Sequence, residues 1–162
     1  MAHSVDDFET WYRAVHPRLG TSLALAFGDV ALAQESTDEA FARALERWDR
    51  VAVMDSPTGW VYRVAFNDAR RRLRRSKFEH HVFRSHRPES VDPPAGELWT
   101  VVADLPARQR QAVVLRHVGQ LLEVEVGAVM GISRGAVSST LRAAYQSLRI
   151  ALADPAPISE AL

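Results

Sequence analysis

The chain has 162 residues, no cysteine, and 20 basic against 20 acidic side chains, so its formal net charge is zero. This length suits one domain or two small ones, and a hydrophobic content of 47% is enough for a modest core in each. Without cysteine, disulfides, thiol redox chemistry and cysteine-ligated zinc are excluded. No segment approaches the ~20 apolar residues of a membrane-spanning helix, and the acidic N-terminus does not resemble a secretory signal. We therefore expect a soluble, cytoplasmic protein that does not insert into a membrane.

The neutral total hides a separation of charge along the chain. Residues 1–50 carry nine acidic and five basic side chains, whereas residues 51–100 carry six acidic and nine basic ones. Segregated charge of this kind suggests two partners of opposite sign. All basic residues except Lys77 are arginines, whose planar fork suits phosphates and guanine edges. The basic half is therefore a candidate nucleic-acid surface.

In the first half of the chain, apolar residues recur every three to four positions, which predicts helices. Pro17 falls inside the first of them and is expected to kink or split it. Ser56 followed by Pro57 is typical of a helix start, with a capping side chain and then proline at the first helical position. The predicted elements are helices over residues 6–28, 31–48 and 57–75, with a loop or irregular helix end over residues 49–55.

A composition break separates this half from the next. The segment "SHRPESVDPPAGE" is rich in proline, serine and acids and predicts an extended, flexible linker. Helical spacing returns after it, and no strand-like alternation competes anywhere in the chain. We predict an all-α protein of two small helical domains. The expected division is a first domain over 1–77, a linker over 78–96, a second domain over 97–153 and a disordered tail over 154–162.

The strongest motif is "EVEVGAVMGISRGAVSSTLRAAYQSL". A short apolar helix ends at Gly131, which can adopt the positive φ that a tight turn requires, and Ser133 can cap the next helix. This next helix would leave Arg134, Ser138 and Arg142 on one outward face at four-residue spacing. The pattern predicts a helix-turn-helix, whose second helix lies in the major groove of DNA. The alternative is a helical hairpin without a ligand.

Residues 105–149 resemble region 4, the promoter −35 reading domain, of the extracytoplasmic-function (ECF) subfamily of sigma-70 RNA polymerase sigma factors. The likeness rests on Leu105-Pro106, Leu115-Arg116, Gly131-Ile132-Ser133 and their spacing. In the first half, "QESTDEAFARALERW" resembles the family segment that docks on core polymerase, and "SPTGWVYRVAFNDARRRLRR" resembles the region 2 helix that engages the −10 element. The two resemblances occur in the family's order and cover nearly the whole chain.

The resemblance implies where DNA would bind. In the first domain, Arg63 and Asn67 would lie near the −10 DNA, and the loop over 49–55 would receive a flipped base. The arginines that follow would lie along phosphates, although a solvated basic helix end is the plainer alternative. The DNA-binding residues implied in the first domain are Arg63, Asn67, Arg70, Arg71, Arg72, Arg74 and Arg75, and those in the second are Ser133, Arg134, Ser138, Ser139 and Arg142.

The resemblance also implies partners. Asp38, Glu39 and Arg43 would contribute to the surface that binds core RNA polymerase, with a plain solvated face as the alternative. Promoter DNA is the second partner, and an anti-sigma factor is a possible third. The family implies no cofactor, no metal and no enzymatic activity of the chain itself. His80, His81 and His86 lack a framing acid and are interpreted as solvated residues.

Five positions depart from the family pattern. Ser138 and Thr140 replace the usual basic residues, so the reading helix has few phosphate anchors. Leu122 replaces a capping serine or threonine, Asp38 replaces a glutamine, and Arg71 replaces an aspartate. Weak −35 recognition is therefore plausible, which keeps open a sigma-like adaptor or decoy that binds polymerase or an anti-sigma protein. The likeness to region 2 disfavours a dimeric repressor, and the lack of a visible catalytic constellation disfavours a nucleic-acid enzyme.

Overall fold

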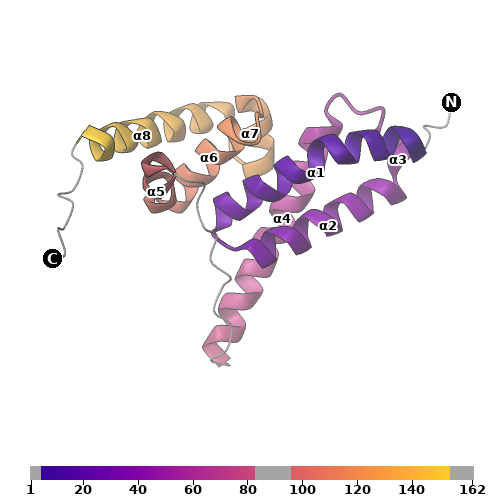
Figure 1. Cartoon of the computed structure of the whole chain (residues 1–162), viewed down its shortest axis with the longest axis horizontal. Coiled ribbons are helices and arrows are strands. Elements are labelled where there is room, and N and C mark those ends of the chain that lie inside the picture. Colours follow the sequence, from indigo (N-terminus) through magenta and orange to yellow (C-terminus); the bar gives the residue numbers. More distant parts are fainter. Residues whose placement is uncertain (1–4, 83–95, 154–162) are drawn as a thin grey trace.

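The structure is a computed structural model of the whole chain, and it describes residues 5–82 and 96–153, with side chains described up to residue 78 in the first segment. Every regular element in these ranges is a helix, which confirms the predicted all-α class (Figure 1). None of the described helices is both long and apolar enough to cross a membrane. The helices are α1 (Val5–Phe27), α2 (Val30–Glu46), α3 (Trp48–Val51), α4 (Pro57–Val82), α5 (Glu97–Asp104), α6 (Ala107–His117), α7 (Glu123–Met130) and α8 (Arg134–Ala153).

The first half is built on α1, α2 and α4. Their facing sides bury apolar residues at helical spacing, among them Leu19, Phe41 and Val61. Pro17 lies inside α1 and does not split it: the helix runs unbroken from Val5 to Phe27. At the start of α2, the Asp29 side chain accepts a hydrogen bond of 2.9 Å from the Leu32 backbone N–H.

Two boundaries in the first half differ from the sequence prediction. α4 continues to Val82, so residues 78–82, which were assigned to the linker, are helical. The predicted loop over 49–55 begins as the four-residue helix α3 and is irregular only after Val51. The rest of the predicted linker, residues 83–95, and the predicted tail, residues 154–162, lie outside the described residues.

In the second half, α7, a tight turn and α8 form the predicted helix-turn-helix. Gly131 ends α7 with φ of 69°, the left-handed conformation expected for it. The Ser133 Oγ then accepts a hydrogen bond of 3.1 Å from the Ala136 N–H and caps α8. Val137 and Leu141 of α8 are buried, as their spacing predicted.

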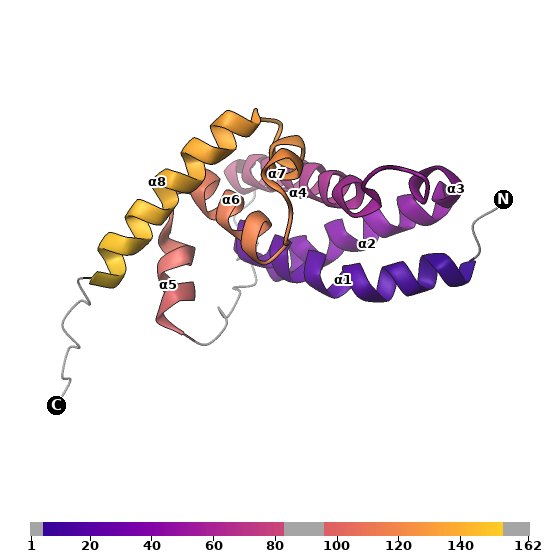
Figure 2. The same ribbon diagram turned by 90° about the horizontal axis from the view of Figure 1, so that it is seen from above.

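The two halves pack directly on each other, with α4 against α7 and α1 against α6 (Figures 1 and 2). Buried residues of both halves belong to one hydrophobic cluster. Polar contacts cross the same boundary: Arg18 Nη1 donates to Gln120 Oε1 at 3.0 Å, and Arg110 Nε donates to the Ala26 carbonyl at 3.1 Å. Figure 1 also shows the C-terminal part of α4 extending beyond the packed helices.

Candidate nucleic-acid and polymerase interfaces

A stripe of polar and basic side chains runs along the exposed side of α4. Its members are spaced by four, three, four and three residues, which places them on one face of the helix. Each is exposed and forms no side-chain hydrogen bond or ion pair with a described residue. The fifth member, Lys77, was not among the predicted site residues, although its spacing from Arg74 could have revealed it. We call these residues the basic stripe: Arg63, Asn67, Arg70, Arg74 and Lys77.

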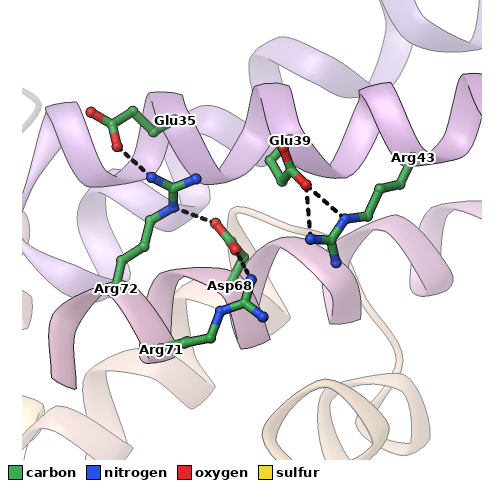
Figure 3. Close-up of polar contacts among 6 residues, drawn as sticks. All are labelled: Glu35, Glu39, Arg43, Asp68, Arg71 and Arg72. Carbon is green, nitrogen blue, oxygen red and sulfur yellow. Dashed lines mark hydrogen bonds and ion pairs between the residues drawn. The ribbon is translucent and has the colours of Figure 1, made fainter. Parts of the chain in front are cut away.

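Arg71 and Arg72 lie outside the stripe and are engaged elsewhere (Figure 3). Both donate to the carboxylate of Asp68, whose side chain is only 2% exposed; the Arg72 Nε contact measures 2.5 Å. Arg72 also donates through Nη1 to Glu35 of α2 at 2.6 Å. The family resemblance implies that both arginines lie along phosphates. In the structure both form ion pairs with Asp68, and the side chain of Arg71 remains 50% exposed. Arg75 is exposed at the edge of this group.

The charge state of Asp68 follows from its surroundings. Burial raises its pKa, but the hydrogen bonds from Arg72 and Arg71 outweigh burial, so the pKa of Asp68 is lowered overall. The same contact with Asp68 raises the pKa of Arg72. Asp68 and Arg72 are therefore charged at neutral pH, and the carboxylate of Asp68 pairs with both Arg71 and Arg72.

The predicted polymerase-binding residues lie together on α2. Glu39 and Arg43 pair across one helical turn, with Arg43 Nε 2.8 Å from Glu39 Oε1 (Figure 3). Asp38 is exposed, and one of its carboxylate oxygens lies 3.0 Å from His16 Nε2 on α1. Phe41 is buried against the aromatic rings of α1, so it supports this surface from below.

The irregular segment that ends at Asp55 lines a hollow of about 550 Å³ between the two halves. Ser56 binds both sides of it: its Oγ accepts the Gly59 N–H at 3.0 Å and donates to Glu125 Oε1 of α7 at 2.6 Å. The hollow is lined by Met54, Asp55, Ser56, Gly59, Trp60, Arg63, Val124, Glu125 and Ala128. The segment proposed to receive a base therefore faces α7 in this structure.

The predicted reading face of α8 is partly occupied by a neighbouring carboxylate. Arg134 and Arg142 are exposed, as is Ser139. Ser138 is half-buried and donates to Glu123 Oε2 at 2.7 Å, and Arg134 Nε lies 3.7 Å from the same oxygen. Nothing in the sequence indicated that Glu123 of α7 would adjoin these residues of α8.

The start of α7 is capped from within the helix. Leu122 offers no side-chain cap, as its identity predicted, but Glu125 Oε2 accepts the Leu122 N–H at 2.8 Å. An acid three residues after the helix start is a known capping signal, so the sequence itself could have indicated this contact. Among the described residues, no group of three or more histidine, aspartate or glutamate side chains could hold a metal ion. The side chains of His80, His81 and His86 lie outside the described residues.

These features define a helix-turn-helix protein of the DNA-binding class, with a second helical half that carries the basic stripe on α4. Residues 101–149 match the family described as "Sigma-70, region 4". The chain is 31% identical over 156 residues to the RNA polymerase sigma-E factor of Streptomyces avermitilis, covering 92% of this chain and 87% of that one. It is 23% identical to the ECF RNA polymerase sigma factor SigW of Bacillus subtilis, covering 78% of this chain and 79% of that one. The chain belongs to the ECF subfamily of sigma-70 RNA polymerase sigma factors.

A solved structure shares the fold across nearly the whole chain. It is the sigma factor RpoE of Bartonella quintana in complex with the anti-sigma factor NepR, with a TM-score of 0.79 and 18% sequence identity. The match covers 94% of this chain and 100% of that one. At this identity the likeness concerns the fold, including its first half.

Proposed function

We propose that this sigma factor binds core RNA polymerase, directs it to promoters, and acts in the cytoplasm without catalysing a reaction itself. The observation that carries the proposal is the presence of two separate exposed surfaces on one chain, each of which carries arginines. One is the basic stripe of α4, and the other is the exposed face of α8 in the helix-turn-helix. Two such surfaces suit a protein that contacts two promoter elements.

The basic stripe suits the −10 element. Arg70, Arg74 and Lys77 lie on one face with no acidic partner among the described residues, so their charge is available to phosphates. Arg63 lines the hollow beside the segment that ends at Asp55, which supports a role for this end of the stripe near the bases.

The exposed face of α8 suits the −35 element. Arg134 occupies the first position of the helix, where a docked recognition helix comes nearest to the base edges. Arg142 lies two turns further along, and Ser139 is exposed between them. The Ser133 Oγ accepts the Ala136 N–H, so we assign Ser133 chiefly to capping the start of α8.

The exposed side of α2 suits core polymerase. Asp38, Glu39 and Arg43 form a charged surface on a helix that is anchored by buried residues beneath it. An anti-sigma factor is a further partner in this proposal, since the B. quintana sigma factor with the same fold was solved bound to one.

The test is transcription by a reconstituted holoenzyme. The full chain is mixed with core RNA polymerase and a library of linear templates with randomised upstream sequence, and the templates that yield transcripts are sequenced. We expect two enriched motifs at a fixed spacing, and Arg134→Ala should remove preference at one upstream position. Failure of the chain to bind core polymerase would overturn the proposal.

A second function, that of an adaptor or decoy, is favoured by one observation. Glu123 places an acidic side chain against Arg134 and Ser138, where DNA would approach. A chain that binds core polymerase but enriches no template sequence would support the adaptor.

A further inference from the structure

Glu123 joins the two members of the α8 face that lie nearest its start. It belongs to the first turn of α7, and its side chain is 32% exposed. One oxygen, Oε2, accepts the Ser138 hydroxyl at 2.7 Å and lies 3.7 Å from Arg134 Nε. Residues 15 and 11 positions away in sequence are thus brought to a single carboxylate oxygen by the tight turn at Gly131.

The position of the carboxylate is set independently of Arg134. Glu123 lies at the N-terminus of α7, where the helix dipole favours a negative charge. The hydrogen bond from half-buried Ser138 fixes Oε2 relative to α8. Arg134, by contrast, has a side chain that is 76% exposed and is constrained by little else.

A guanidinium whose Nε faces a fixed carboxylate still has both terminal nitrogens available. Those two nitrogens form the fork that binds the O6 and N7 atoms of a guanine. The carboxylate therefore limits the orientations of Arg134 without consuming the donors that read a base.

We propose that Glu123 is a positioning residue that sets the base preference of Arg134, an inference that rests on the proposed reading of −35 DNA by α8. Its charge has a second effect, because a carboxylate close to the DNA repels phosphates. Glu123 thus lowers affinity for every duplex while it sharpens the preference among them. The pairing of Ser138 with Glu123 also explains how a chain without a basic residue at position 138 retains an ordered reading face.

The test uses holoenzyme formed from the full chain and core RNA polymerase, bound to a pool of duplexes with a randomised upstream segment. Glu123→Gln keeps an oxygen that can accept from Ser138 but removes the charge that faces Arg134. We expect it to strengthen binding to the whole pool and to weaken preference at one base position by about two- to fivefold. Arg134→Ala should weaken preference at the same position by about five- to 150-fold.

Two further variants isolate the mechanism. In the Arg134→Ala background, adding Glu123→Gln should leave base preference unchanged, because Glu123 acts through Arg134. The matched control is Glu97→Gln, which removes the same charge from the first turn of α5, a helix that packs near Leu148 at the other end of α8. It should leave base preference unchanged.

The outcomes separate this inference from the function on which it rests. If the wild-type holoenzyme prefers no base in the upstream segment, the proposed −35 reading fails and the inference fails with it. If the wild type shows a preference that Glu123→Gln leaves intact, the proposed function stands and the positioning role of Glu123 is overturned. A shift in preference in the Arg134→Ala background would also overturn it.

Discussion

Six basic side chains lie between Arg70 and Lys77 of α4, and their surroundings separate them into two groups. Asp68 and Glu35 bind Arg71 and Arg72 on the side that faces α2. Arg70, Arg74 and Lys77 face solvent on the opposite side, with Arg75 at the margin. The buried carboxylate of Asp68 thus pairs with two of the six basic side chains and leaves Arg70, Arg74 and Lys77 without an acidic partner among the described residues.

This division predicts unequal effects on the salt dependence of DNA binding. Arg70→Ala and Arg74→Ala should each reduce the slope of log K against log salt concentration by about 0.9 on duplex, or about 0.7 on single strands. Arg71→Ala is the matched control and should reduce the slope much less, because its guanidinium is paired with Asp68. The measurement is holoenzyme binding to promoter DNA at several salt concentrations. Equal reductions by all three variants would show that the ion pairs do not select among the arginines.

Asp68 also predicts a dependence of stability on pH. Its lowered pKa means that the ionised carboxylate contributes stability above its unfolded pKa of about 3.9, and that this contribution is lost as pH falls through the lower folded value. Asp68→Asn should therefore cost about 1–3 kcal/mol at neutral pH, through the loss of charge-assisted hydrogen bonds.

The measurement is the free energy of unfolding in urea for both proteins at pH 7 and near pH 3. The difference between them should shrink at the lower pH, where the wild-type carboxyl becomes protonated. A difference of the same size at both values would mean that the stabilising contacts of Asp68 do not depend on its charge.

At the scale of elements, the sequence predicted those turns and helix boundaries that are set by neighbouring residues. The turn between α7 and α8 was predictable, because Gly131 supplies the positive φ, Ser133 supplies the cap, and the apolar spacing defines the buried side. The end of α4 was not, because helical apolar spacing stops before Val82 while no proline or glycine breaks the helix there. Phe78 is 74% exposed, so no core contact marks this part of the helix in the pattern.

Contacts between helices could not be predicted from the sequence, for a different reason. Glu35 and Arg72 are 37 residues apart, and their ion pair depends on how α2 is positioned along α4. The contact of Glu123 with Ser138 depends in the same way on the crossing of α7 and α8. Motif resemblance predicted the reading face of α8, but only the packing of the helices revealed the carboxylate of Glu123 beside it.

The start of α7 offers a prediction at this scale. Leu122 has extended backbone geometry, is 60% exposed, and provides no side-chain oxygen to the free N–H groups of the helix. Leu122→Ser should supply that oxygen and be more stable than Leu122→Ala by about 1 kcal/mol. In a chain of this size the difference corresponds to roughly 2–4 °C in Tm, measured by thermal unfolding. Equal Tm values for the two variants would indicate that Glu125 already satisfies the start of α7.

At the scale of the whole molecule, the packing of the halves answers a question that the sequence left open. The sequence predicted two domains and a linker, with no indication of whether the domains touch. In the structure, Tyr62 of α4 lies in the shared core, and a side chain added at Gly119 would come within 3.1 Å of its ring. Because both halves contribute to this core, the relative position of the two proposed DNA surfaces depends on the core remaining packed.

The last prediction follows from the size of this packed form. A compact chain of 162 residues has a radius of gyration of about 15 Å, and therefore a diameter of roughly 40 Å. The numbers −10 and −35 place the centres of the two elements about 25 base pairs apart, and at about 3.4 Å per base pair this spacing is roughly 85 Å of duplex. One packed body cannot reach both elements, so we expect α4 and α7 to separate when the sigma factor assembles with core polymerase.

Because the chain has no cysteine, pairs of dyes can be placed on it without side reactions. Gln34→Cys on α2 and Gln146→Cys on α8 lie at exposed positions in different halves, and energy transfer between dyes at these sites should be high in the free protein. It should fall when core polymerase is added, because breaking the contact of Ser56 with Glu125 and the shared apolar surface allows the halves to move apart. The matched control pairs Glu9→Cys with Gln34→Cys within the first half, where transfer should stay constant. If the labelled holoenzyme supports promoter-dependent transcription while transfer between the halves stays high, the packed form is itself the active one, and its two DNA surfaces do not reach the two elements independently.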